Sequence, residues 1–333
     1  MNTAMVSVVC LAYNHEKYIR AALDSCLMQR MDFPLEIIVH DDASTDATAD
    51  IIGAYAQRYP QVIKPVYQKE NQYVHGWKFL LADVFPRCTG RYIAFCEGDD
   101  YWTDPEKLRK QVDFLEAQRD FVMSFTDCRE VDAQGVVLKE RCIAEHGDRT
   151  YTYDDMPVYA PTLTRVCRNV HFHDIPKSFA HAPGGDTYLA VWLSKFGKVR
   201  FQDFISADYR IIDQGVWSGK DSFRQSVHLF YTRYAILDIA EGKLEKKMRY
   251  AAAVFLGAMR TRARGAVELR ACSDAYRTLR AYCRKKKNPR RSAGLDDAVF
   301  QVSVFFWYYL YFFIKRLKMR GGQLRLAAGR GVR

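Results

Sequence analysis

Three acidic residues lie within four positions directly after an apolar stretch of the chain. Residues 91–96 have the character of a buried strand, and Glu97, Asp99 and Asp100 follow them. Carboxylates at the end of a strand are hard oxygen ligands on a rigid support, which suits Mg²⁺ or Mn²⁺ bound together with substrate phosphates. The same residues could instead form an ordinary turn, because Gly and Asp favour turns. The segments around this cluster help to distinguish a metal site from an ordinary turn.

Two earlier apolar stretches also end in polar residues. Residues 5–12 run into Tyr13 and Asn14, and residues 34–40 run into Asp41 and Asp42. Helical patterns follow each stretch, and this alternation predicts an α/β fold with a doubly wound, mostly parallel sheet flanked by helices. Because ligands bind at the carboxyl ends of such strands, we expect all these side chains to converge on one edge of the sheet.

The first strand is not followed by a glycine-rich phosphate-binding motif. A dinucleotide oxidoreductase and a P-loop enzyme are therefore both disfavoured. A nucleotidyltransferase, which also binds metal through carboxylates on an α/β sheet, would need a basic glycine-rich loop at the same place. It remains an alternative to the function derived below.

The later part of the chain predicts shorter elements. In chain order we expect a short strand over 62–67, a helix around 76–85, a helix from Asp104 and Pro105 to about 118, a strand over 121–127 with a hairpin partner at 136–139, a helix over 188–196, and strands over 197–201 and 205–211. Asp186 precedes the helix over 188–196 and could cap it. His171 and His173 could share one strand face, but loop polarity explains them more simply than a metal site does.

Charge is distributed unevenly along the chain. The net charge is +11, yet residues 241–333 hold 23 Lys and Arg against 6 Asp and Glu, so the first 240 residues are mildly acidic. Such asymmetry predicts an anionic partner for the C-terminal part. The nine cysteines include no Cys-x-x-Cys pair, which argues against a disulfide framework or a zinc site and favours reduced thiols in a cytosolic protein.

Residues 298–314 carry no charge and are flanked by basic residues. Seventeen residues is the lower limit for a membrane-spanning helix. The Trp and Tyr content and the basic flanks suit a membrane interface, while a packed helix and a contact in a homo-oligomer are the alternatives. We expect residues 221–333 to form a helical basic extension that binds an anionic membrane surface through residues 284–320. This region is too apolar for nucleic acid.

Three motifs of the first half, in order and in register, resemble those of family 2 glycosyltransferases, which are inverting enzymes of the GT-A fold. The matching segments are residues 6–14, 37–46 and 92–102, and the resemblance extends over about residues 4–220. Within this family the chain is similar to a bacterial subgroup that carries Cys-Glu-Gly-Asp-Asp-Tyr-Trp, here residues 96–102. The resemblance implies a catalytic domain over residues 1–220.

The resemblance also implies a role for each polar residue at the strand ends. Tyr13 and Asn14 would lie against the nucleotide. Asp41 would hydrogen-bond the base, typically uracil, with Asp42 close by.

The acidic cluster and Asp186 complete the implied site. Glu97 and Asp99 would match the two acids of the Asp-x-Asp motif, with Asp99 as the direct metal ligand. Asp100 would lie near the sugar or the acceptor, and Asp186 would match the catalytic base. Glu97 departs from the motif because its side chain is longer than that of Asp.

A second departure lies in a loop that would cover the acceptor. The subgroup often has Tyr-Arg-x-His before Trp-Ser-Gly, whereas this chain has Arg210 followed by Asp213 at the position of the His, and then Trp217. We expect Arg210, Asp213 and Trp217 to belong to this lid. No Gln-x-x-Arg-Trp motif occurs, which disfavours a processive polymerase.

These observations predict a metal-dependent hexosyltransferase that uses Mn²⁺ or Mg²⁺. It would transfer a sugar, with inversion, from a nucleotide-diphosphate sugar (a UDP-sugar) to a glycan or lipid-linked acceptor in bacterial surface polysaccharide or glycolipid synthesis. We expect it in the cytoplasm or on the inner face of the cytoplasmic membrane. A non-catalytic protein that binds an anionic surface through its basic tail is the alternative from another class.

Overall fold

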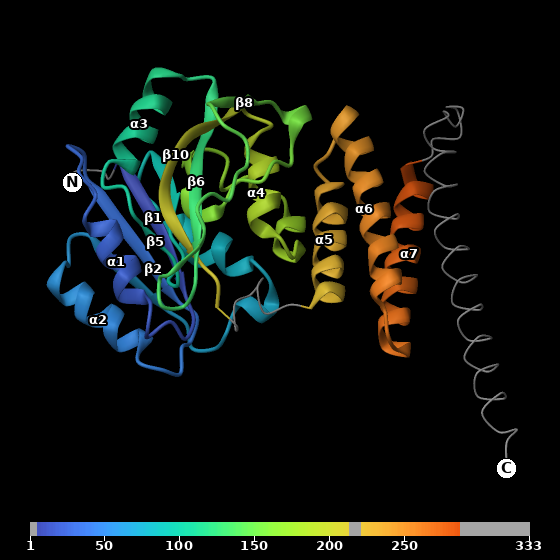
Figure 1. Cartoon of the computed structure of the whole chain (residues 1–333), viewed down its shortest axis with the longest axis horizontal. Helices are drawn as coiled ribbons and strands as arrows, with labels where there is room; N and C mark the ends of the chain where they lie inside the picture. The colour runs from blue at the N-terminus through green and yellow to red at the C-terminus, as the bar shows by residue number, and fades with distance from the viewer. Residues whose placement is uncertain (1–4, 213–220, 287–333) are drawn as a thin grey trace, which may run out of the picture. The chain divides into compact units, whose positions relative to one another are not determined.

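The computed structural model of the protein describes residues 5–212 and 221–286. The chain divides near residue 220 into two compact units, an α/β unit and a helical unit (Figure 1).

The first part of the α/β unit is a parallel sheet. Its strands are β1 (Val6–Ala12), β2 (Leu35–Asp41), β3 (Ile63–Tyr67) and β4 (Tyr92–Phe95), and they pair in the order β3-β2-β1-β4. Strands β1, β2 and β4 are almost wholly buried, as the near-continuous apolar sequence predicts. Helices α1 (Ile19–Leu27) and α2 (Thr48–Arg58) connect successive strands. The predicted α/β sheet with flanking helices is confirmed.

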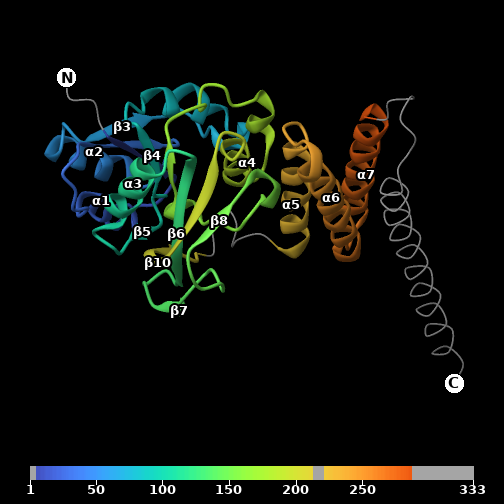
Figure 2. The same cartoon turned by 90° about the horizontal axis from the view of Figure 1, so that it is seen from above.

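The second part of the sheet is mixed. Strand β9 (Val166–Arg168) runs antiparallel between β4 and β6 (Phe121–Val131), and β10 (Lys198–Arg210) pairs parallel with β6. Three short strands, β5 (Tyr101–Trp102), β7 (Val137–Lys139) and β8 (Arg149–Tyr151), pair antiparallel with β10 or β6. Figure 2 shows β6 and β10 side by side, with β7 at one end of β6.

Several element boundaries differ from the sequence expectations. Residues 76–85 do not form an α-helix: a π-helical turn (Leu80–Val84) leads into a 3₁₀ turn (Phe85–Arg87) that contains Pro86, which has no N–H to donate. The two strands expected over 197–211 are one strand, β10, whose register against β6 shifts at bulges. Strand β6 likewise continues to Val131.

Two helices begin at other residues than expected. Helix α3 (Lys107–Ala117) begins after a turn in which the Asp104 carboxylate accepts the N–H of Glu106 at 2.8 Å. Helix α4 (Gly185–Leu193) begins three residues early, so Asp186 lies in its first turn and Gly184 occupies the cap.

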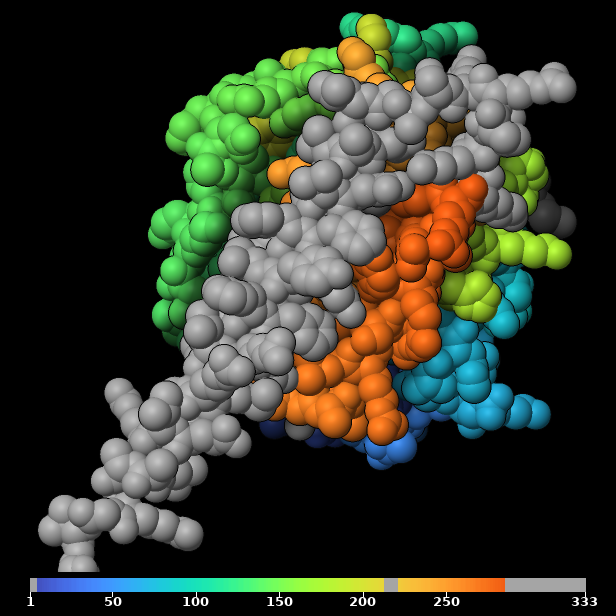
Figure 3. Space-filling model, turned by 90° about the vertical axis from the view of Figure 1, so that its right-hand side faces the viewer, coloured from blue at the N-terminus to red at the C-terminus, as the bar shows by residue number. Residues whose placement is uncertain are grey.

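The described part of the second unit, residues 221–286, contains three helices, α5 (Ser222–Ile236), α6 (Gly242–Arg262) and α7 (Ala266–Lys286). Asp221 caps α5 by accepting the N–H of Arg224 at 2.8 Å, and Leu244, Met248 and Leu256 of α6 are buried. Figure 3 shows the face of this unit on which α7 lies, coloured orange to red.

Within residues 5–212 and 221–286, none of the helices has both the length and the apolar composition needed to cross a bilayer. The uncharged segment 298–314, and with it most of the predicted membrane-binding stretch 284–320, lies outside the described residues.

Glu36 is a buried carboxylate that joins four segments of the parallel sheet. Its Oε1 accepts the Ser7 hydroxyl at 2.5 Å and the N–H and hydroxyl of Thr89 at 2.6 and 2.9 Å, while Lys64 pairs with its Oε2. Burial alone would raise the pKa of Glu36, but the hydrogen bonds from Lys64, Ser7 and Thr89 outweigh burial and lower it. The ionised carboxylate therefore stabilises the sheet.

We predict that Glu36→Gln lowers the free energy of unfolding by about 1–3 kcal/mol at pH 7, because an amide cannot accept from all these donors and leaves Lys64 unpaired. Glu106→Gln, which removes only an exposed ion pair with Arg109, should change stability by less than about 0.5 kcal/mol. Urea unfolding measures both.

The same variant tests the charge. A lowered folded-state pKa stabilises fully above the unfolded value of 4.5, and that contribution is lost as the pH falls through the folded value. The difference between wild type and Glu36→Gln should therefore shrink in acid. An equal difference at pH 7 and at low pH would show that the charge is not its source.

Candidate active site

The acidic turn after β4 is fastened to the end of β1. Gly98, between the two acids of the motif, donates its N–H to the Leu11 carbonyl at 2.8 Å. A Cβ at this position would lie 2.9 Å from His15 Nδ1 and 3.1 Å from the Ala12 Cβ. Only glycine lets the turn approach β1 this closely, which brings Glu97 and Asp99 to the carboxyl edge of the sheet.

Arg210, at the end of β10, holds this turn from the other side. Its backbone N–H donates to Asp100 Oδ1 at 2.7 Å and its Nε donates to the Asp99 carbonyl at 2.8 Å. The guanidinium lies 4.9 Å from the ring centre of Tyr18 and 5.0 Å from that of Tyr101. In the described chain Arg210 therefore supports the acidic turn, whereas the sequence suggested a lid residue.

Asp100 is buried. Burial, together with the charges of Asp99 and Glu97, raises the pKa of Asp100 well above its usual range, while the hydrogen bond from Arg210 opposes this. One carboxylate oxygen of Asp100 is engaged with β10.

Glu97 has an unused ligand atom. Its Oε2 is buried and has no hydrogen-bond partner among the described residues. Burial, and then the charge of Asp99, raises the pKa of Glu97 to about 7, while Arg165 acts in the opposite direction. A buried carboxylate oxygen without a partner is costly unless a ligand satisfies it.

Asp99 is more open, with 22% of its side chain exposed, and His15 Nε2 lies 3.9 Å from its Oδ2. The Nδ1 of His15 is also buried without a partner in the described chain. His15 could not be connected with the acids from the sequence, because only the packing of residues 12–19 against Gly98 brings them together.

The two aspartates at the end of β2 differ in their hydrogen-bond partners. Asp42 accepts the backbone N–H groups of Gln72 at 2.7 Å and Tyr73 at 3.0 Å, one on each oxygen. Asp41 accepts the Ser44 N–H at 3.2 Å through Oδ2, but its Oδ1 is buried and unpartnered within the described residues. Asp41 therefore has an acceptor to offer to a ligand, and Asp42 orders the loop at 72–73.

The residues after β1 divide in a similar way. Asn14 adopts a positive φ of 55°, accepts the Thr45 N–H at 2.8 Å and donates its own N–H to the Ser44 hydroxyl at 2.9 Å. It connects the end of β1 to the loop after β2. Tyr13 is 43% exposed, and so its ring is accessible beside that loop.

One pocket is lined by both Glu97 and Asp186. Its other walls are largely apolar and come from β1, β4, the 77–80 segment, residues 162–165, Phe179 and α4: Val9, Leu11, Trp77, Leu80, Phe95, Thr162, Arg165, Phe179, Gly185 and Leu189. A Cβ on Gly185 would lie 2.6 Å from Trp77 Nε1, and so the first turn of α4 can pack against Trp77 only because glycine precedes Asp186.

Asp186 is fixed by Arg165, a residue that the sequence did not single out. Arg165 is 3% exposed; it donates through Nη1 to the Asp186 carbonyl at 2.7 Å, and its Nη2 lies 3.6 Å from Asp186 Oδ2. The Asp186 side chain remains 44% exposed. Because Arg165 also donates from Nε to the Ala160 carbonyl at 2.8 Å, the guanidinium is held rigidly next to the carboxylate.

Among the remaining predicted residues, Asp213 and Trp217 lie outside the described part of the chain. His171 and His173 both contact Asp174, at 3.1 and 3.4 Å.

Comparison with known proteins agrees with this geometry. Residues 7–171 match the family described as Glycosyl transferase family 2. An uncharacterised protein of Mycobacterium tuberculosis is 35% identical over 257 residues, 73% of this chain and 70% of its own. The putative teichuronic acid biosynthesis glycosyltransferase TuaG of Bacillus subtilis is 34% identical over 222 residues, 65% of this chain and 82% of its own.

Among solved structures, residues 1–349 of TarS from S. aureus in complex with UDP-GlcNAc superpose with a TM-score of 0.60 at 20% identity, over 82% of this chain and 80% of that one. This similarity confirms the GT-A fold expected from the sequence. The acidic turn, the pocket and the extent of the match to TuaG lead to one conclusion: the chain belongs to glycosyl transferase family 2.

Proposed function

We propose that the α/β unit transfers a hexose, with inversion, from a UDP-sugar to a hydroxyl group of an acceptor glycan. The observation that carries this proposal is the single pocket lined by both Glu97 and Asp186. Inversion by one displacement needs a base on one side of the sugar and a charged site for the leaving diphosphate on the other. A pocket with acidic groups on two different elements, β4 and α4, can supply both.

The residues present fit a divalent cation. Asp99 is partly exposed and Glu97 Oε2 is buried without a partner among the described residues, so two carboxylates have oxygen atoms available. Carboxylate oxygens suit Mg²⁺ or Mn²⁺. Asp99 and Glu97 would hold the ion, which would neutralise the charge that develops on the departing diphosphate.

Asp186 would act as the general base. Its exposed carboxylate accepts the proton of the acceptor hydroxyl while that oxygen attacks the anomeric carbon and the bond to the diphosphate oxygen breaks. Arg165, 3.6 Å away, attracts the carboxylate and fixes its position. The apolar walls of the pocket limit water near the reacting carbon.

The nucleotide would bind at the ends of β1 and β2. The unpartnered Oδ1 of Asp41 can accept an N–H of the base, and the exposed ring of Tyr13 can lie against the base or ribose. Asn14 and Asp42 would position these loops through the hydrogen bonds described above. The UDP-GlcNAc complex of TarS, a protein of the same fold, supports a UDP-sugar as the donor.

The acceptor is the least constrained partner. The description of TuaG as a teichuronic acid biosynthesis glycosyltransferase supports a role in bacterial surface polysaccharide or glycolipid synthesis. The basic flanks and the uncharged aromatic segment of residues 284–320 suit an anionic membrane surface, where a lipid-linked acceptor would be found. We therefore propose that the enzyme works at the inner face of the cytoplasmic membrane and that Asp213 and Trp217, which lie outside the described residues, contribute to acceptor binding.

Asp186→Asn should lower kcat by about 10²–10⁴-fold, because the amide cannot accept the proton, and should leave the Kd for UDP within a few-fold of wild type. Coupled UDP-release kinetics and calorimetry measure the two quantities. Asp120→Asn, on an exposed acid paired with Lys198, is the matched control and should retain full activity. Near-normal turnover of Asp186→Asn with a true acceptor would refute the base assignment.

Asp99→Ala should remove the Mn²⁺-dependent part of UDP affinity, since a direct ligand to the ion is lost. Calorimetry with and without Mn²⁺ isolates that part, and Asp113→Ala, on the exposed face of α3, should behave as wild type. Unchanged binding of UDP and Mn²⁺ by Asp99→Ala would contradict its role as a ligand.

Glu97→Gln should stabilise the metal-free protein at pH 8 by about 1–3 kcal/mol while it reduces activity. Because the folded-state pKa is raised from 4.5 to about 7, ionising Glu97 costs stability, and this cost grows as the pH rises through that interval. Thermal unfolding should show the gain at pH 8 but not at pH 4.

The exposed Glu140→Gln is the control for Glu97→Gln and should shift neither stability nor its pH dependence. A loss of stability in metal-free Glu97→Gln at pH 8 would mean that the buried carboxylate has partners other than a bound cation.

A further inference from the structure

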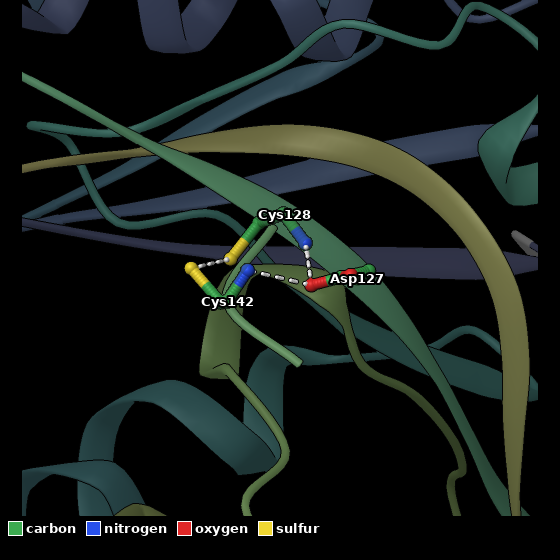
Figure 4. Close-up of side chains that lie close together, drawn as sticks. All are labelled: Asp127, Cys128 and Cys142. Carbon is green, nitrogen blue, oxygen red and sulfur yellow. Dashed lines mark hydrogen bonds between the residues drawn. The ribbon is translucent and has the colours of Figure 1, made fainter. Parts of the chain in front are cut away.

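Two cysteines of the α/β unit lie in contact away from the pocket. Cys128 is on β6 and Cys142 follows β7, and their Sγ atoms are 3.2 Å apart (Figure 4). The backbone N–H of Cys142 donates to the Cys128 carbonyl at 2.9 Å. A disulfide requires Cα atoms about 4.4–6.8 Å apart. The backbone hydrogen bond and the short Sγ–Sγ distance both indicate that the two cysteines are close enough to join.

Asp127 fixes this arrangement. Its Oδ1 accepts the backbone N–H groups of Cys128 at 2.8 Å and Cys142 at 3.0 Å (Figure 4). The same oxygen accepts the N–H of Ile143 at 3.0 Å, and Oδ2 lies 2.8 Å from Arg141 Nε. Asp127 is fully buried. The segment that carries Cys142 is therefore held against β6 by a carboxylate with no other function evident in the described chain.

The same contacts argue against a metal ion at this cluster. The Oδ1 of Asp127 already accepts three backbone N–H groups, and its Oδ2 lies 2.8 Å from Arg141 Nε in an ion pair that lacks hydrogen-bond geometry. Tetrahedral zinc with Zn–S bonds of about 2.3 Å would also hold two sulfurs roughly 3.8 Å apart, which is farther than the 3.2 Å here. The geometry is closer to that of two thiols that can join directly.

We propose that Cys128 and Cys142 are a redox-active pair that forms an intramolecular disulfide when the protein meets a low-molecular-weight disulfide oxidant. The Cys142 thiolate attacks one sulfur of the oxidant and releases the other as a small thiol. Cys128 then gives up its proton and attacks the Cys142 sulfur, which releases the second small thiol. Two protein thiols are oxidised and one small disulfide is reduced to two thiols.

The order of the two steps follows from access. Cys142 is partly exposed and Cys128 is buried. The hydrogen bond to Cys142 and burial both raise the pKa of Cys128, which makes it the resolving thiol. By contrast, Cys26 and Cys96 also lie next to each other but are wholly buried, so an oxidant has no route to them.

The disulfide would close a ring of residues 128–142. This ring includes backbone groups that bind Arg210, which supports the acidic turn. Residues 128–142 contain the β6–β7 hairpin, and the carbonyls of Asp132 and Ala133 at its tip accept hydrogen bonds from Arg210 Nη1 at 3.3 and 3.1 Å. Oxidation would therefore fasten the hairpin covalently at its base without touching the pocket. The inference is independent of the proposed sugar transfer.

Oxidised glutathione applied to the full-length protein tests the proposal. Non-reducing peptide mapping should show one peptide pair joined through Cys128 and Cys142, lighter by two hydrogens, while Cys26 and Cys96 remain free thiols. The melting temperature should rise by roughly 5–10 °C, because the cross-link restricts a 15-residue ring of the unfolded chain, and dithiothreitol should reverse the rise.

Variants separate the pair from the other thiols. Cys142→Ser and Cys128→Ala should each abolish the cross-link and the melting shift. Cys283→Ser removes the other partly exposed cysteine of the described chain and should leave both intact. A stable glutathione adduct on Cys142 with Cys128 still free would overturn the proposal, as would stoichiometric Zn²⁺ binding that protects both thiols from the oxidant.

Discussion

The structure depends on keeping three carboxylates close together at the end of β4 while leaving some of their oxygens available. Each acid meets this constraint differently. Asp100 is buried and accepts a backbone N–H from β10, Asp99 stays partly open, and Glu97 keeps an oxygen atom without a partner among the described residues. Like charges in a low-dielectric site raise the free energy of the folded chain. Such an arrangement persists when the surrounding fold is stable enough to tolerate it, and the cation that we propose for this site would relieve it.

Two arginines from later in the chain hold the acidic residues in this arrangement. Arg210 reaches the backbone of the acidic turn, and Arg165 reaches Asp186 from the beginning of β9. Both bind carbonyl oxygens as well as lying near carboxylates, so their positions do not depend on the charge state of the acids. The two arginines thus determine where the acidic groups lie and leave carboxylate oxygens available for ligands.

The strand ends could be predicted from the sequence because parallel strands place their following residues on one edge, whatever the details of packing. For that reason the position of Tyr13, Asp41 and Glu97 at this edge could be predicted, while their roles stay predictions. Arg165 and His15 could not be predicted in this way. Arg165 contacts Asp186, which is distant in sequence, and His15 lies next to the acids only because Gly98 approaches it closely. The difference in hydrogen bonding between Asp41 and Asp42 could not be predicted either, because it depends on the N–H groups of Gln72 and Tyr73, which Asp42 accepts. The start of α4 was missed because Gly185, a poor helix former, is required there by the contact with Trp77.

Strand β9 runs against its neighbours β4 and β6, and this reversal changes which residues can reach the carboxyl edge. A parallel strand contributes residues that come after it, whereas β9 contributes Arg165, which comes before it. The residues that immediately precede β9 therefore reach the site, and among them the Ala160 carbonyl holds the Arg165 guanidinium in place. An insertion between Ala160 and β9 would therefore displace Arg165 from Asp186.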